Sequence, residues 1–132
     1  MSLLGFAFIA LRPIETQKLK VEISNFNQKP TTYIYISVFN ENDFLEKSIQ
    51  TKKVSANGNE VFVEFDLPPG EYAVSTYHDT NDNGELDRYF IGKPKEPYGF
   101  SNNVRPFGPP SFDKCMIEIG ESARTIAIEL ID

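Results

Sequence analysis

Short segments in which apolar and polar residues alternate run through most of this chain and restrict it to sheet structure. The alternation is clearest at residues 19–26, 31–40, 60–67 and 123–130. It places every second side chain on one face of an extended strand, as in strands that are buried on one side only. The residues expected to face the core are Leu19, Val21, Ile23, Ile34, Ile36, Val38, Val61, Val63, Phe65, Ile126, Ile128 and Leu130.

Turn-forming residues separate these segments and suggest which strands are neighbours. The pair Asn57-Gly58 lies between the extended runs 48–54 and 60–67. Because both residues tolerate positive φ, the sequence predicts a β-hairpin there. A second pair of strands is expected at the end of the chain, joined by a turn at 120–122.

The length and composition of the chain favour one domain rich in β-structure. At 132 residues it can bury about two-thirds of the surface of its unfolded form. Nine prolines and eight glycines indicate many turns, and no segment has the apolar spacing of a helix. These features predict an all-β fold, an antiparallel β-sandwich of immunoglobulin-like size with about seven strands and one long irregular loop. We expect a single domain at 18–132, preceded by an apolar segment at 1–17.

This amino-terminal segment contains the most apolar window of the chain. Residues 3–11 read LLGFAFIAL, which is too short for a membrane-spanning helix of about 20 residues. The window is similar to the apolar part of a secretory signal, although no lysine or arginine precedes it. A signal remnant and a first strand are both consistent with it. An ordered apolar end could pack on the sheet or on a second copy of the chain in a homodimer.

The charge of the chain argues against a nucleic-acid surface, and its cysteine content excludes an intrachain disulfide. The formal charge is −6, and the 13 basic residues are scattered along the chain. A nucleic-acid surface needs clustered lysine and arginine, so the sequence argues against nucleic acid as a partner. Cys115 is the single cysteine, which excludes an intrachain disulfide, and its strand-like context predicts a small buried side chain.

One stretch, residues 78–103, has neither strand nor helix periodicity. It reads HDTNDNGELDRYFIGKPKEPYGFSNN and is rich in Asn, Asp, Gly, Pro and aromatic residues. A structureless connection longer than about 12–15 residues is uncommon in a compact domain unless the segment is functional or disordered. This stretch is therefore where we expect a functional site.

The first part of the stretch, residues 79–87, has the residue spacing of a calcium loop. Oxygen-bearing side chains occupy positions one, three and five, glycine occupies position six, and a carboxylate occupies position nine. A calcium ion requires several oxygen ligands at about 2.3–2.6 Å, and alternate residues of a tight coil can supply them. The candidate metal ligands are Asp79, Asn81, Asn83 and Asp87 through their side chains and Glu85 through its carbonyl oxygen.

The candidate calcium loop departs from the full pattern at its last position. There Phe90 stands in place of a bidentate carboxylate. The loss predicts weak binding, with a Kd of about 10⁻⁴–10⁻³ M, unless Asp82 or Glu96 folds back to complete the ligand shell. At an ion concentration near Kd, bound calcium would add only about 0.4 kcal/mol of stability. The alternative is that the Asp and Asn side chains only cap their own turn while Gly84 adopts positive φ.

His78, the only histidine, lies beside Asp79 at the expected end of a strand. A histidine titrates near neutral pH and can act as a general base. However, the sequence places no serine or cysteine nucleophile beside it, and no second histidine completes a transition-metal pair. We therefore expect a structural histidine, no catalytic residue and no enzymatic activity.

The second part of the stretch, extended to residues 92–107, combines aromatic side chains with Gly, Pro and Asn. Exposed aromatic rings on such a loop could stack on a sugar ring or receive a peptide, with asparagine amides as hydrogen-bond partners. The alternative is that the rings fold back and cover the end of the sandwich. The candidate ligand-binding residues are Tyr98, Phe100, Asn102 and Asn103, together with Phe107.

Three runs that follow one another in this order carry a resemblance to a known family. They are LPPGEYAV at 67–74, HDTNDNGELD at 78–87 and GKPKEPYGFSNN at 92–103. Together they resemble the signature of an uncharacterised bacterial family, domain of unknown function family 2141, over nearly the whole chain from Lys18 onward. The resemblance implies a transthyretin-like (prealbumin-like) or immunoglobulin-like sandwich and a small exported protein, periplasmic or extracellular. It implies no activity.

Overall fold

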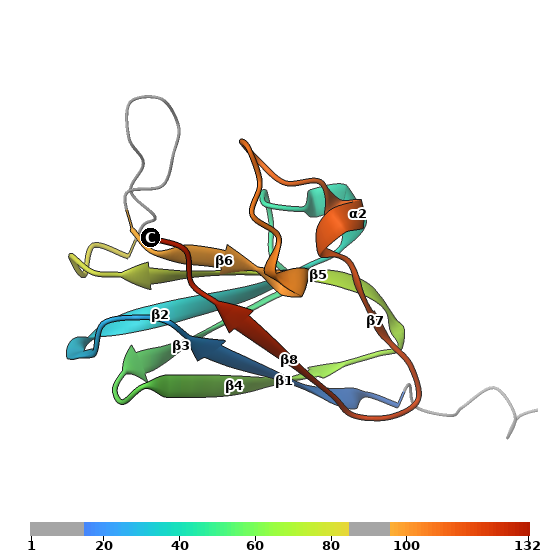
Figure 1. The fold of residues 1–132 in the computed structure, drawn as a ribbon. Coiled ribbons are helices and arrows are strands. Elements are labelled where there is room, and N and C mark those ends of the chain that lie inside the picture. The colour runs from blue at the N-terminus through green and yellow to red at the C-terminus, as the bar shows by residue number, and fades with distance from the viewer. Residues whose placement is uncertain (1–14, 85–95) are drawn as a thin grey trace, which may run out of the picture.

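The structure, a computed structural model, describes residues 15–84 and 96–132, so most of the apolar segment expected at 1–17 lies outside the described residues. Two β-sheets pack face to face around one core (Figure 1). The strands are β1 (Gln17–Ser24), β2 (Lys29–Phe39), β3 (Gln50–Ala56), β4 (Glu60–Leu67), β5 (Gly70–Asp79), β6 (Tyr98–Phe100), β7 (Ile117–Ile119) and β8 (Arg124–Glu129). The short helices are η2 (Glu41–Asp43), η3 (Ser101–Asn103) and α2 (Phe112–Cys115).

The strand order confirms the predicted β-sandwich. One sheet has three strands in the order β4-β1-β8. The other has five, in the order β3-β2-β5-β6, with β7 paired to β5 beyond this path. Among the described strands every pairing is antiparallel except that of β1 with β8, which run parallel with Leu19 opposite Arg124.

The main core lies between the two sheets and consists of the apolar stripes that alternation predicts. The expected core residues are all buried except Ile126, which is partly buried against the same core. Phe65 is fully buried and is the largest such side chain in the described residues. Because the inward side chains of both sheets contribute, neither sheet can bury its apolar face without the other.

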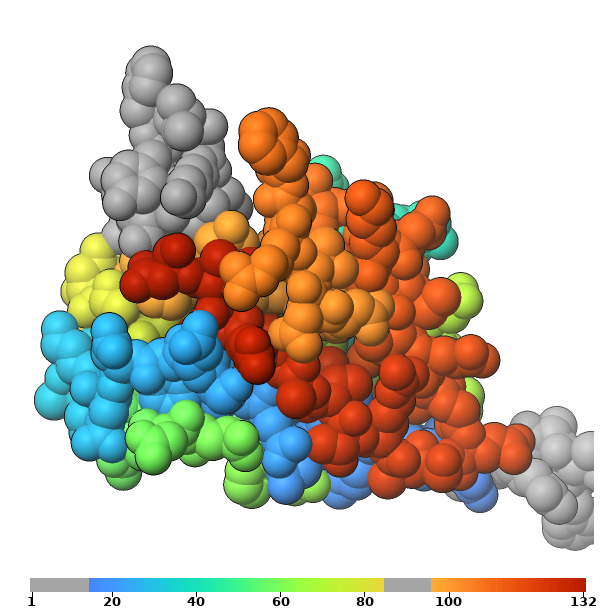
Figure 2. Space-filling model, viewed as in Figure 1, coloured from blue at the N-terminus to red at the C-terminus, as the bar shows by residue number. Residues whose placement is uncertain are grey.

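A second, smaller apolar cluster covers one end of the five-stranded sheet on the side away from the main core. Phe44, which follows η2, meets Phe39 and Phe112 edge to face, with ring centroids 5.6 and 5.8 Å apart. Ala73, Phe100 and Cys115 are its other buried members, and the partly buried side chains of Tyr98, Val104 and Met116 pack against them. It explains why Phe39 is buried although it points away from the main core. In Figure 2 the part of the chain after Glu96, orange to red, forms much of the visible surface.

The hairpin predicted at Asn57-Gly58 is wrong, because β3 and β4 lie in different sheets. β3 pairs with β2, whereas β4 pairs with β1. The turn itself is present: Gly58 has φ +90° and donates its N–H to Gln28 Oε1 at 2.6 Å. The two residues permit a tight reversal, yet the reversal carries the chain from one sheet to the other. Val61 and Val63 thereby face the core from the opposite side.

The expected pairing of the last two strands is also wrong. The segment before the turn at 120–122 begins in the helical turn α2, which ends at Cys115. Only Ile117–Ile119 of this segment is extended, and it pairs with β5. β8 pairs with β1 in the other sheet. Pro109 and Pro110 precede α2 and lack the N–H that a strand would use, whereas a helix leaves its first N–H groups unpaired in any case. Cys115 is fully buried, as predicted, but it ends a helical turn and does not lie in a strand.

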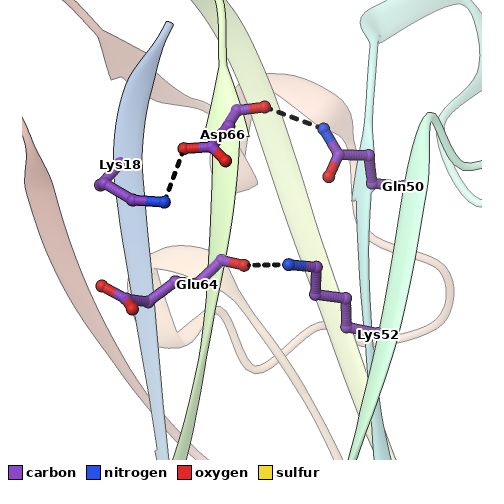
Figure 3. A network of polar contacts seen from close by, with 5 residues as sticks. All are labelled: Lys18, Gln50, Lys52, Glu64 and Asp66. Carbon is purple, nitrogen blue, oxygen red and sulfur yellow. Dashed lines mark hydrogen bonds and ion pairs between the residues drawn. The ribbon is translucent and has the colours of Figure 1, made fainter.

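Side chains bridge the flank of the sandwich where β3 and β4 lie. Gln50 Nε2 donates to the backbone oxygen of Asp66 at 2.9 Å, and Lys52 Nζ donates to that of Glu64 at 2.6 Å (Figure 3). The Asp66 carboxylate forms an ion pair of 2.9 Å with Lys18 on the neighbouring strand. Edge carbonyl groups of β4 are thus occupied by side chains of β3, which makes pairing with another chain less favourable there.

Backbone and side-chain contacts bridge the opposite flank. Tyr98 and Ile131 exchange two backbone hydrogen bonds, 3.0 Å from the Tyr98 N–H and 2.6 Å from the Ile131 N–H. Asn103 Nδ2 donates to the oxygen of Ala127 at 3.2 Å, and its Oδ1 accepts the N–H of Glu129 at 2.9 Å. The side chain of Asn103 therefore takes the place of a neighbouring strand along β8.

Candidate functional site

The end of β5 brings two polar residues into the interior where the irregular stretch begins. His78 is opposite Ile34 and Asp79 is opposite Tyr33 in the antiparallel pairing with β2. His78 points into the sandwich and is 1% exposed, while Asp79 points the other way and is 0% exposed. A buried carboxylate requires hydrogen-bond partners, and those of Asp79 come from the turn that follows.

The carboxylate of Asp79 organises the first half of the predicted calcium loop. Oδ2 accepts the N–H of Gly84 at 2.7 Å, and Oδ1 accepts the N–H of Asn83 at 3.2 Å. Gly84 has φ +77° and Asp82 has φ +56°, so the chain turns sharply around the carboxylate. Asn81 Oδ1 also accepts the N–H of Asn83, at 3.3 Å. The predicted positive φ of Gly84 is confirmed, and Glu85, Asp87 and Phe90 lie outside the described residues.

Glu96 reaches the same turn from the far end of the irregular stretch. It is 4% exposed, and its Oε2 accepts the N–H of Thr80 at 2.7 Å and contacts Thr80 Oγ1 at 3.3 Å. Lys29 Nζ donates to the oxygen of Thr80 at 3.2 Å. Glu96 is one of the two residues expected to fold back on this loop, and its carboxylate does lie against Thr80, the residue that follows Asp79.

His78 is held in one tautomer by a short chain of hydrogen bonds. Thr32 Oγ1 donates its single proton to the oxygen of Lys29 at 2.7 Å, so its 2.7 Å contact with His78 Nε2 requires that Nε2 be the donor. The other ring nitrogen, Nδ1, is then a buried acceptor, and it has no hydrogen-bond partner among residues 15–84 and 96–132. Phe26 meets the ring edge to face at 6.1 Å. This arrangement suits a neutral imidazole.

The stability of the protein should fall as the pH drops below about 6.5. Burial lowers the pKa of His78 from its ordinary value of 6.5, although the carboxylates of Glu96 and Asp79 act in the opposite direction. The unfolded chain then binds a proton at His78 more readily than the folded chain does. The contribution of neutral His78 to the free energy of unfolding is therefore complete above pH 6.5 and is lost as the pH falls through the pKa that His78 has in the folded protein. Urea midpoints at pH 7.5 and 5.5 measure this, and His78→Gln should remove this part of the pH dependence. An unchanged slope in that variant would assign the effect to other groups.

The aromatic part of the stretch is built into the fold. Tyr98 is half-buried in β6, which pairs with β5, and Phe100 is 9% exposed within the second apolar cluster. Asn102 Nδ2 donates to the backbone oxygens of Lys114 and Met116, at 3.0 and 2.9 Å. Asn103 caps β8 as described, while residues 92–95 lie outside the described residues. These contacts leave Tyr98 more accessible than Phe100.

Sequence reasoning missed two features of this region. Ser101 is fully buried; its Oγ accepts the N–H of Val74 at 3.0 Å and also bonds the backbone oxygen of Cys115. Nothing in the local sequence separates this serine from an exposed one. The second feature is the stacking of Tyr35 on Tyr77, with ring centroids 5.2 Å apart and planes at 9°. Alternation places both rings on the same side of the sheet, but the strand register is needed to bring them together.

Two further observations restrict the chemistry of the described residues. No group of three or more His, Cys, Asp and Glu residues among them is arranged to hold a metal ion. Burial raises the pKa of the Cys115 thiol to about 11, which keeps it protonated and unreactive at neutral pH. In the part of the chain that the structure describes, no helix has the length and apolar character needed to cross a membrane.

Comparison with solved structures finds matches in a pilus-presented adhesin. One structure of the adhesin shares 13% identity over 92% of this chain and 28% of the adhesin chain, with a TM-score of 0.34. A cysteine-to-alanine variant of the same adhesin shares 12% identity over the same fractions, with a TM-score of 0.30. The chain thus spans less than a third of the length of the adhesin chains it matches. No curated protein matches the chain.

A family match covers most of the sandwich. Residues 21–127 match the family described as "Uncharacterized protein conserved in bacteria (DUF2141)". The matched range begins within β1, ends within β8 and includes the three motifs at 67–74, 78–87 and 92–103. This confirms the resemblance found in the sequence: the chain belongs to this uncharacterized bacterial protein family.

Proposed function

We propose that the chain is a noncatalytic, exported β-sandwich protein whose loop at 79–87 binds calcium weakly. The observation that carries the proposal is the Asp79 carboxylate, which is fully buried at the end of β5 and holds the following turn through Asn83 and Gly84. In a calcium loop the chain turns sharply in this way so that side chains at alternate positions can supply oxygens to one ion. This is the arrangement that a hard cation requires.

Glu96 is the residue we propose to replace the carboxylate that Phe90 does not supply. Its buried carboxylate lies against Thr80, next to Asp79 in the chain. The other proposed ligands are those that the loop spacing predicts, namely Asn81, Asn83, the carbonyl oxygen of Glu85, and Asp87. Two neutral asparagines in this set favour weak affinity, because each carboxylate ligand adds charge that attracts the cation.

Calcium should raise the melting temperature of the protein by a few degrees. With a Kd of about 10⁻⁴–10⁻³ M, 2 mM calcium would add about 0.6–1.8 kcal/mol to the free energy of unfolding. Thermal melts with 2 mM calcium and with a chelator measure this directly. Asp87→Asn should abolish the increase without changing the melt in chelator, whereas Asp113→Asn, in a helical turn outside the loop, should keep it.

A different result would favour the alternative in which the Asp and Asn side chains only cap their own turn. That alternative accounts for the same hydrogen bonds to Asp79 without an ion. Equal melting temperatures with calcium and with chelator, together with unchanged amide exchange at 79–84, would exclude the calcium site. An equal increase with magnesium would show that the loop binds divalent cations without selecting the larger one.

The proposal of a noncatalytic protein is supported by the burial of its single histidine. A general base must reach a proton on the substrate, but His78 is 1% exposed and its Nε2 is bonded to Thr32. The proposed export is supported by the resemblance of the three central motifs to a family of small exported proteins.

A second proposed function is that of a carbohydrate- or peptide-binding accessory domain that uses the segment 92–107. The observation that favours it is Phe107, whose side chain is as exposed as in an unfolded peptide. The ring is therefore accessible to a ligand, and aromatic side chains are common in the lining of ligand-binding sites. Loss of ligand binding in Phe107→Ala, with an unchanged melting temperature, is the result expected for this function.

A further inference from the structure

Three tyrosines lie side by side across the five-stranded sheet, on the face away from the main core. Tyr35 of β2 is opposite Tyr77 of β5, and Tyr77 is opposite Tyr98 of β6. Their chain neighbours Ile34, Ile36 and Gly99 face the core, which fixes the tyrosine side chains on the other side. Neighbouring strands are about 4.8 Å apart, so the row is about 10 Å long.

Short hydroxyl side chains surround this row. Thr51, Ser37 and Ser75 form the neighbouring row on the same face, with Ser37 Oγ 2.8 Å from Thr51 Oγ1. Ser55 is opposite Tyr33, and its hydroxyl donates to the oxygen of Pro30 at 2.8 Å. Tyr33 lies on the same face, with Lys53 Nζ 4.3 Å from its ring centroid. We call this surface the tyrosine face; it consists of Tyr33, Tyr35, Ser37, Thr51, Lys53, Ser55, Ser75, Tyr77 and Tyr98.

The tyrosine face differs in charge from the chain as a whole. Asp and Glu make up 19 of the 132 residues, and the formal charge is −6, yet no residue of the tyrosine face is acidic. Asp79, two residues after Tyr77 on β5, points to the same face of the sheet but is fully buried. The single cation, Lys53, is already placed over an aromatic ring. A charged partner would therefore gain little here, whereas an uncharged partner loses no charge solvation on contact.

We propose that the tyrosine face binds an uncharged polysaccharide. This rests on the second function proposed above. It names the ligand class and centres the binding surface on the five-stranded sheet, where Tyr98 is the one member that also belongs to the segment 92–107. A sugar ring has one face of C–H groups, which packs on an aromatic ring, and a rim of hydroxyls, which pairs with serine, threonine and tyrosine hydroxyls. The tyrosine face offers both kinds of group in neighbouring rows, and among the tyrosines the Tyr77 hydroxyl already donates to the oxygen of Gly84 at 3.2 Å.

An extended peptide fits this sandwich less well than a sugar. Peptides that bind β-sandwiches commonly add a strand to a sheet edge and draw their affinity from backbone hydrogen bonds. On one flank, the side chains of Gln50 and Lys52 bind edge carbonyls of β4. On the other flank, the side chain of Asn103 binds backbone groups of β8, and Ile131 pairs with Tyr98. A partner that uses side chains on a sheet face requires no free edge.

Affinity gels and pull-down experiments test the proposal. The probes are soluble hydroxyethylcellulose, galactomannan and dextran in native gels, and insoluble cellulose and chitin in pull-down. At least one should retain the protein, and Tyr35→Ala and Tyr98→Ala should each weaken retention by about three- to tenfold. Tyr35→Phe, which keeps the ring, should bind nearly as well as the native chain. The chain has no tryptophan, so its fluorescence comes from tyrosine, and this fluorescence should change when a sugar packs on the tyrosine face.

Two controls keep a negative result meaningful. Phe62→Ala removes an aromatic ring that is 52% exposed on the three-stranded sheet, and it should leave binding unchanged. Melting curves of every variant show whether the fold is intact. If the native chain binds but the tyrosine variants bind equally well while Phe107→Ala does not, the second proposed function stands and the tyrosine face is excluded. The proposal is overturned if no probe retains the protein. It is also overturned if the acidic polysaccharide alginate retains the protein and the uncharged probes do not.

Discussion

Replacing Asp79 with alanine should lower the free energy of unfolding by about 3–5 kcal/mol, because two hydrogen bonds to a charged acceptor are lost at a buried position. The N–H groups of Asn83 and Gly84, at 3.2 and 2.7 Å from the carboxylate, would lose their acceptor. Asp79 is 0% exposed, so water does not reach its site without a local rearrangement. Urea denaturation at pH 7 measures the loss. The free energy of unfolding of Asp79→Asn should lie between those of the native chain and Asp79→Ala, since asparagine keeps one acceptor oxygen.

The matched control for this prediction is Asp66→Ala. The carboxylate of Asp66 forms an ion pair of 2.9 Å with Lys18, but its side chain is 58% exposed. Exposed ion pairs contribute about 0–1 kcal/mol, so the loss should be several-fold smaller than for Asp79→Ala. Equal effects of the two substitutions would show that the turn after β5 does not depend on the buried carboxylate, and the proposed calcium site would lose its main support.

Gly99→Ala should destabilise the protein by about 3 kcal/mol, at the upper end of what overpacking a core costs. A Cβ at this position would lie 2.6 Å from Ile128 Cγ2 and 3.3 Å from the backbone oxygen of Glu129. Ile128 is fully buried and branched at Cβ, so its methyl group cannot move away freely. β6 and β8 would have to separate, and the backbone hydrogen bonds between Tyr98 and Ile131 would weaken. Chemical denaturation of the variant measures the cost.

Gly120→Ala provides the comparison for Gly99→Ala. A Cβ at Gly120 would meet no atom within 4 Å, and its φ lies outside the left-handed region. The free energy of unfolding should therefore change by less than about 1 kcal/mol, with a small increase expected from the reduced freedom of the unfolded chain. A loss at Gly99 as small as that at Gly120 would mean that the two sheets are not in close contact along this flank.

The periodicity of the sequence predicts which side of each strand is buried, but it does not predict which strands are neighbours. Val61, Val63 and Phe65 are in the core as expected, because alternation depends only on the chain itself. The hairpin at Asn57-Gly58 was wrong because a tight turn is equally compatible with a crossing between sheets. The choice depends on how both sheets bury their apolar faces together, which no local window contains.

The same distinction applies to the candidate site. The hydrogen bonds of Asp79 to residues four and five positions later are local, and the alternative in which Asp and Asn side chains cap their own turn predicts bonds of this kind. The contact of Thr32 with His78 joins residues 46 positions apart, and that of Thr80 with Glu96 joins residues 16 positions apart. These long-range contacts fix the histidine tautomer and place Glu96. They require the strand register, which a single sequence does not provide.

The parallel pairing of β1 with β8 also determines when this domain can fold. Leu19 pairs with Arg124, so the three-stranded sheet joins a strand near the start of the chain to the last one. Without β8, only β1 and β4 remain in that sheet, and a two-stranded ribbon is at best marginally stable in water. Ribosomes add about 5–20 residues per second, so β8 becomes available only seconds after β1. Contacts between residues this distant in sequence also slow folding. Folding is therefore completed only after synthesis of β8, and until then the unpaired edge of β1 is a surface on which chaperones can act.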